Sequence, residues 1–178
     1  GTNRYRGVNP ANGIVIYYNL PQLMKTDVVT MEIKDSTGNI VRTFSSQADK
    51  NFRRWAGGPG GEPTLSTAKG LNRFVWDLRY PTMPGVPNVY IEAGYAGHKA
   101  IPGKYSITIK SGSQTISTTA EILANPQYPT TAEQFKEYHQ TMLAMATELK
   151  AMHLMVNNLY DKQKQLEGLL SSLPDDAK

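Results

Sequence analysis

The sequence predicts a mainly β protein in which an antiparallel β-sandwich of six to seven short strands is followed by one long C-terminal α-helix. Two observations predict this fold class. Within residues 1–128, short runs that alternate apolar and polar side chains are separated by clusters rich in Gly, Pro and Asn, which is typical of half-buried strands joined by turns. Within residues 129–178, apolar residues recur instead at steps of three and four, the spacing of one helix face.

Length and composition limit the classes of protein to consider. A chain of 178 residues holds one ordinary core plus an appendage, which we place at residues 1–128 and 129–178. The absence of cysteine excludes disulfides, zinc–thiolate sites and a thiol nucleophile. No apolar run approaches the ~18–20 residues of a membrane span. No signal peptide opens the chain, which we expect to be a segment of a longer protein.

Six runs of alternating or β-branched residues predict the strands of the sandwich: residues 13–20, 27–34, 40–45, 72–79, 105–110 and 115–123. Residues 13–20 carry apolar side chains on both faces, which predicts a central strand. The second and third runs flank a turn, as do the last two, so each pair predicts a hairpin. Alternation directs one set of side chains into the core: Phe74, Trp76, Leu78, Tyr105, Ile107 and Ile109.

Two long surface loops are expected at residues 47–69 and 81–103, because Gly57–Gly61 and repeated prolines interrupt regular structure. A short strand is expected inside the second loop, at Val89–Ile91. The first loop contains the only cluster of basic residues: Lys50, Arg53 and Arg54. Nucleic-acid-binding domains show a basic stripe together with a recognisable motif. Because the other basic residues are scattered, neither nucleic acid nor a membrane is predicted as a partner.

Trp55 follows Arg53 and Arg54 in the first loop. An exposed Trp offers a flat apolar face on which a sugar ring can stack, so a carbohydrate-binding module centred on Trp55 is an alternative function. Clustering of Trp55 with Tyr90 or Tyr95 on one exposed face would favour this alternative. Burial of Trp55 would favour a scaffold.

The last part of the chain has one continuous helical pattern. Residues 130–133 and 131–134 both have the spacing of a capping box. Beyond them, eleven of twelve heptad positions are apolar, with Gln163 as the exception: Phe135, Tyr138, Met142, Met145, Leu149, Met152, Val156, Leu159, Leu166, Leu170 and Leu173. The pattern passes unchanged through the asparagines at 157–158, so we expect a single helix that frays at Gly168 and ends near Pro174.

This helix is expected to be longer than the sandwich is wide. About 37 residues of helix span roughly 55 Å, whereas a sandwich of about 125 residues is roughly 35–40 Å across. Part of the apolar stripe therefore needs another partner, and a second copy of the chain, most simply antiparallel, is the expected one. We call the central part of the stripe the seam: Met142, Met145, Leu149, Met152, Val156, Leu159 and Leu166.

No catalytic or metal-binding constellation is visible in the sequence, so we expect neither enzymatic activity nor a cofactor. His139 and His153 are about 21 Å apart along the predicted helix, too far to share a metal, and are expected to pack beside the seam. A glycosidase needs two carboxylates facing each other, and the sequence pairs none. Asp77, between Arg73 and Arg79, is expected to form a solvated cross-strand ion pair on the outer face of its strand.

Four stretches of the chain resemble one family: RYRGVNPANG at residues 4–13, GLNRFVWDLRY at 70–80, PGKYSITIK at 102–110 and NPQYP at 125–129. They resemble the Ig-like sandwich of the flagellar hook-capping protein. They are more similar still to the C-terminal accessory module of secreted bacterial proteins whose main body is a sortilin-like, BNR-type β-propeller, often described as a glycosyl hydrolase.

The resemblance implies an Ig-like sandwich that serves as a non-catalytic accessory or docking domain of a larger exported protein. The implied partner is the parent propeller domain, and the implied location is the periplasm or the extracellular space. Any hydrolase site of the parent would then lie outside this segment, because the repeated Asp-box motifs of propeller blades are absent from it.

Overall fold

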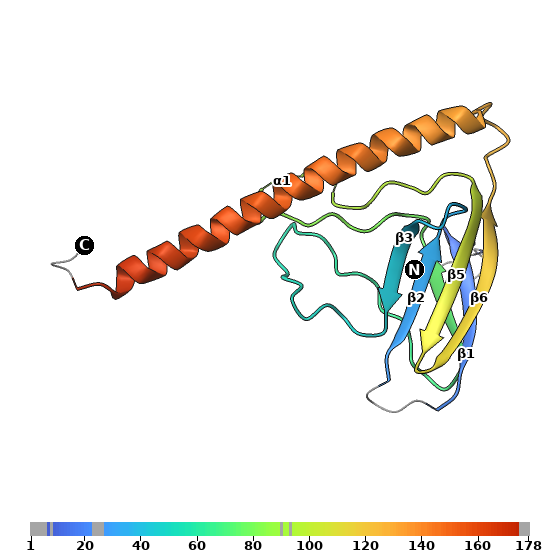
Figure 1. Cartoon of the computed structure of the whole chain (residues 1–178), viewed down its shortest axis with the longest axis horizontal. Helices are drawn as coiled ribbons and strands as arrows, with labels where there is room; N and C mark the ends of the chain where they lie inside the picture. The colour runs from blue at the N-terminus through green and yellow to red at the C-terminus, as the bar shows by residue number, and fades with distance from the viewer. Residues whose placement is uncertain (1–6, 8, 23–26, 90, 93, 175–178) are drawn as a thin grey trace.

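The computed structural model describes residues 7, 9–22, 27–89, 91–92 and 94–174. Its elements are β1 (Ile14–Leu20), β2 (Val29–Lys34), β3 (Ile40–Ser45), β4 (Gly70–Trp76), β5 (Gly103–Ser111), β6 (Gln114–Ile122) and α1 (Ala132–Ser172). The strands stack as two sheets, and α1 crosses obliquely over one end of them and projects well beyond (Figure 1). The predicted fold class, a mainly β sandwich followed by a long helix, is confirmed.

Both sheets are antiparallel. One contains β1 and β4, and the other has the order β3-β2-β5-β6. The two predicted hairpins are β2–β3 and β5–β6, and a bulge between Ile33 and Lys34 interrupts the first of them. The strand boundaries expected from the sequence agree with the structure to within a few residues, which is the usual uncertainty at element ends.

Strand β1 is not the central strand that its sequence predicts. Within the described residues it pairs with β4 alone. Ile16, Tyr18 and Leu20 point into the core, whereas Val15 and Tyr17 point outward. The outward residues are a β-branched and an aromatic side chain, which stabilise a strand by their shape as well as by burial. Apolar character on both faces therefore did not indicate a central position.

The second loop contains no strand at its described positions 89 and 91, and Tyr90 lies outside the described residues. A single bridge between Arg79 and Lys99 is the only β-type pairing there that involves described residues. The loop is rich in Pro and Gly, and proline lacks the N–H that a ladder requires.

The core lies between the two sheets, as the alternation predicts. Trp76 is fully buried and its ring meets Tyr105 edge-on at a centroid distance of 5.4 Å. Phe44 and Phe74 form a second edge-on pair across the sheets, at 4.7 Å. Leu78 also reaches the core but lies beyond the end of β4 with a left-handed φ of 62°, so it packs from the start of a loop rather than from a strand.

Helix α1 is a single helix of 41 residues, which corresponds to about 60 Å. Of the two capping boxes that the sequence offers, the structure uses the second. The Gln134 amide donates to Thr131 Oγ1 at 3.2 Å, and the Thr131 amide donates to Gln134 Oε1 at 2.8 Å. The helix ends just before Pro174, as expected, but it continues without a break through Gly168, where fraying was expected.

Candidate functional site: the docked helix and its exposed seam

Helix α1 is attached to the loops of the sandwich through one of its flanks. We call this the docking flank, and its residues are partly or fully buried: His139, Ala146, His153, Asn157 and Tyr160. His153 is the buried residue of the helix, and its Nδ1 lies 2.6 Å from the carbonyl oxygen of Pro84. Because a carbonyl oxygen only accepts hydrogen bonds, Nδ1 must carry the proton.

Asn157 makes the next contact along the docking flank. Its Nδ2 donates to the carbonyl oxygen of Gly85 at 2.8 Å. Pro84 and Gly85 belong to the loop between β4 and β5, so two successive loop carbonyls are bound by two side chains one helical turn apart. A hydrogen bond of this kind contributes about 0.5–1.5 kcal/mol net to stability. The two bonds therefore orient the helix on the loops without burying much of its apolar surface.

A cluster of three rings fixes the N-terminal part of the helix. Tyr80 stacks on His98 with ring centroids 4.2 Å apart, and His98 Nε2 lies 3.4 Å from His139 Nδ1. Burial lowers the pKa of His98 below its ordinary value of 6.5, and the nearby His139 acts in the same direction. His98 is therefore neutral at pH 7, as suits a ring packed between two others.

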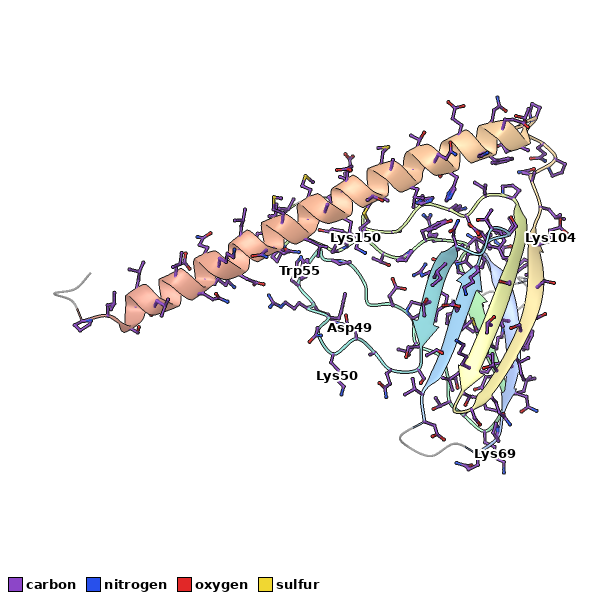
Figure 2. The ribbon with its side chains drawn as sticks, in the orientation of Figure 1. Asp49, Lys50, Trp55, Lys69, Lys104 and Lys150 are labelled. Carbon is purple, nitrogen blue, oxygen red and sulfur yellow. The ribbon has the colours of Figure 1, made fainter. Side chains whose placement is uncertain are left out.

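Trp55 connects the first loop to the loop that binds the helix. A Cβ added to Gly58 would lie 2.6 Å from Trp55 Cε2, and one added to Gly85 would lie 2.6 Å from Trp55 Cζ2. The indole is thus in close contact with two glycines that have no room for a side chain. Figure 2 shows Trp55 between the first loop and the middle of α1.

The first loop, the Pro84–Gly85 region and the middle of α1 enclose a groove with a volume of about 1060 Å³, which we call the loop groove. Arg53, Arg54 and Trp55 all line it, so the structure brings the predicted ligand-contact residues together. Arg53 also reaches Asp161 of the helix at 2.9 Å, although 75% of its side chain is exposed. An ion pair that exposed contributes little to stability.

Of the two tyrosines whose clustering with Trp55 would favour sugar binding, the one that the structure describes does not cluster with it on an exposed face. Tyr95 is buried and does not line the loop groove, and Tyr90 lies outside the described residues. Trp55 is partly buried against Gly58 and Gly85, which leaves less of its ring free for stacking. These positions favour Trp55 as a packing residue between the two loops.

The seam of α1 remains largely uncovered. Met142 is partly buried, and the other six seam residues are exposed by 38% to 61%. The loops contact the docking flank instead, which lies beside the seam on the helix surface. From Met145 to Leu170 the exposed apolar face continues for about 37 Å, and two neighbouring side chains extend it: Met155 and Leu169.

A buried arginine, which the sequence analysis did not single out, connects the two sheets. Arg42 of β3 is 5% exposed, and its Nη1 donates to Asp77 Oδ1 at 3.1 Å and to the carbonyl oxygens of Arg79 and Tyr80 at 3.1 and 3.2 Å. It also forms an ion pair with Glu62. Asp77 therefore forms an ion pair with another strand, as expected, but its partner is the buried Arg42 and not a solvated side chain. Asp77 also accepts from the Arg79 amide.

The Arg42 ion pair keeps Glu62 ionised. Burial alone would raise the pKa of Glu62, but hydrogen bonds from Arg42 and from the Thr82 amide outweigh it and hold this pKa below its ordinary range. Glu62 belongs to the first loop and Thr82 to the second. The network therefore joins the two loops that contact the helix, and we assign it a structural role.

Within the described part of the chain, no group of three or more His, Asp or Glu side chains could hold a metal ion. No helix among these residues combines the length and the apolar character needed to cross a membrane. Comparison of the chain with protein-family models, with curated proteins and with solved structures returned no match. Function therefore has to be inferred from the residues of the site.

Proposed function

We propose that this chain is a non-catalytic docking module, in which the sandwich and its loops hold helix α1 so that the seam is presented to another protein. The observation that supports this most is the division of the helix surface. The docking flank binds the loops through His153 and Asn157, while the six exposed seam residues face away from these contacts.

Covering this exposed apolar stripe would stabilise a complex with another protein. Burial of apolar surface contributes roughly 25 cal/mol per Å², and monomeric proteins rarely expose contiguous apolar patches beyond a few hundred Å². Four of the seven methionines of the chain lie on the seam or beside it, at positions 142, 145, 152 and 155. Flexible methionine side chains adapt well to the surface of a partner.

The wider context of the module is proposed from the sequence resemblance. We propose that it belongs to a larger exported protein with a β-propeller body, acting in the periplasm or outside the cell. The propeller would be one neighbour of the module, and any glycosyl hydrolase activity would belong to the propeller. The segment itself contributes a scaffold and a protein-binding helix.

A carbohydrate-binding module centred on Trp55 is the second candidate. The loop groove favours it, because the groove has room for a sugar and is lined by Trp55, Arg53 and Arg54. We rank it below the docking module because Trp55 already packs against Gly58 and Gly85. Stacking on a sugar needs a free ring face.

The double variant Leu149→Asp/Val156→Asp tests the docking proposal. It puts two charges on the seam, and we expect it to abolish association measured by sedimentation, either of the chain with itself or with the adjoining propeller. The matched control is Ala144→Asp/Ala151→Asp, which places the same charges seven residues apart on the side of α1 away from the seam. The control should associate like the wild type, and circular dichroism should be alike in all three proteins.

Two results would contradict the docking proposal. One is a wild-type chain that associates neither with itself at high concentration nor with the adjoining propeller. The other is a control variant that loses association as completely as the seam variant, because the effect would then come from charge on the helix and not from the seam.

A further inference from the structure

We propose that the occupant of the seam is the seam of a second copy of this chain, running antiparallel in one defined register. This inference rests on the proposed docking function and adds the identity and geometry of the partner. It is carried by three observations: the heptad spacing of the exposed residues, the charges on the free flank of α1, and the occupation of the other flank by the loops.

The spacing of the seam fits another helix. Its residues alternate between two heptad positions, a and d, which recur every 3.5 residues on average and suit a left-handed two-helix coiled coil. In an antiparallel pair, a residues of one helix lie opposite d residues of the other. Pairing Leu149 with Leu159 of the second copy also pairs Val156 with the second Met152, and Met142 with the second Leu166.

This register uses the whole stripe. The two-fold axis crosses the stripe at the height of residue 154, near the middle of the stripe, so that every heptad position from Phe135 to Leu173 has a counterpart. A two-fold pair of this kind is self-complementary, because the same patch on each copy covers the other. Any other antiparallel register that matches a with d leaves at least one heptad of apolar residues uncovered.

The charges on the free flank select the same register. This flank, heptad position g, lies on the far side of the seam from the docking flank and contains Thr141, Glu148, Met155, Lys162 and Leu169. Position g faces position g of the partner in an antiparallel pair. Glu148 then faces Lys162 of the second copy, the reciprocal pair forms by symmetry, and Met155 faces its own counterpart. Sliding one helix along the other by one heptad would place Glu148 beside Met155 or Leu169 of the second copy instead.

The docking flank disfavours the parallel alternative. In a parallel pair, position g of one helix faces position e of the other, so Glu148 would need His153 as its neighbour. His153 is 8% exposed and its Nδ1 is bound to Pro84 of its own chain. In the antiparallel pair the two docking flanks lie together on one side of the helix pair, where each His153 keeps its contact with Pro84 of its own chain. The g flanks, which the loops do not use, meet on the other side, so Glu148 gains Lys162 of the second copy as its neighbour in place of His153.

Charge exchange tests the register. Glu148→Lys or Lys162→Glu alone converts two attractions into two repulsions, and we expect either to weaken the dimer about tenfold in sedimentation equilibrium at low salt. The double variant Glu148→Lys/Lys162→Glu restores both pairs and should return the dissociation constant to near the wild-type value. Glu137→Lys, the same change on the side of α1 away from the seam, should have little effect.

Crosslinking tests the direction, since the chain has no cysteine of its own. Thr141→Cys mixed with Leu169→Cys should be joined by a short bifunctional maleimide. Thr141→Cys alone should not be joined to itself, because 28 residues of helix would hold the two sites about 42 Å apart. A parallel pair would give the opposite result.

Failure of this inference is distinguishable from failure of the docking function. A wild type that stays monomeric but binds the adjoining propeller through the seam would overturn the second copy as occupant and leave the docking function standing. Crosslinking of Thr141→Cys to itself, or no recovery in the double charge variant, would overturn the antiparallel register. No association of the seam with any protein would overturn both proposals.

Discussion

Replacing Trp76 with alanine is expected to lower the free energy of unfolding by about 3–5 kcal/mol, a large part of the total for a small domain. Trp76 is fully buried between the sheets, meets Tyr105 edge-on, and donates from Nε1 to the carbonyl oxygen of Arg79 at 3.1 Å. The substitution would leave a large cavity and would remove one of the two hydrogen bonds that the Arg79 carbonyl oxygen accepts. Urea unfolding followed by circular dichroism measures the effect.

Leu71→Ala on the same strand is the matched control for Trp76. Leu71 is an apolar residue of β4 that points outward and is 74% exposed, so its loss should change stability by no more than about 0.5 kcal/mol. Equal effects of the two substitutions would contradict the placement of the core between the sheets.

Replacing Arg42 with alanine is expected to cost about 2–4 kcal/mol, the second-largest effect. The change removes the shared partner of Glu62 and Asp77 and of the carbonyl oxygens of Arg79 and Tyr80. Both carboxylates are about half-exposed, which keeps the cost below that of a fully buried pair. The loops that carry α1 should loosen as well, which protease cleavage within residues 47–64 would report.

Two further substitutions define the role of Arg42. Arg42→Lys retains the charge but lacks the fork of donors that reaches two carboxylates and two carbonyls together, so it should recover only part of the lost stability. Arg73→Ala removes an exposed arginine from the outer face of β4 and should be nearly neutral. If Arg42→Ala were as mild as Arg73→Ala, the network would have no structural role.

The fold class and the core could be predicted because each depends on a short-range pattern. Phe74 and Trp76 lie two residues apart on the buried face of β4, and the inward positions of β5 alternate with polar residues. The position of a strand within a sheet does not follow from such a pattern. A strand with one neighbour, such as β1, can have the composition of a central strand, because Tyr17 stabilises an extended backbone whether or not another sheet layer covers it.

The orientation of the helix could not be predicted from its apolar stripe. A stripe usually indicates the face that meets the core, yet here polar contacts from His153 and Asn157 place a neighbouring flank against the loops. A weak signal for this was present in the sequence. Asparagine is a poor helix former, so an asparagine in the middle of a regular heptad pattern indicates a side chain with a specific partner.

The Arg42 network also left a signal that pattern analysis passes over. Arg42 shares the inward face of β3 with Phe44, and its guanidinium lies 5.0 Å from the centroid of that ring. A charged residue in phase with core residues has to find partners when it is buried. Its partners come from two other segments of the chain, and only the tertiary structure brings them together.

The central claim, that the seam is the surface another protein covers, is tested most directly by a pair of single-cysteine variants. Met152→Cys lies on the seam and Leu154→Cys lies off it, and the two native side chains are equally exposed at 51%. Maleimide labelling of the dilute, dissociated chain should therefore proceed at similar rates at the two sites. At high concentration, or in the presence of the proposed propeller partner, labelling of Met152→Cys should slow several-fold while that of Leu154→Cys stays unchanged. Equal rates at both sites under all of these conditions would contradict the claim.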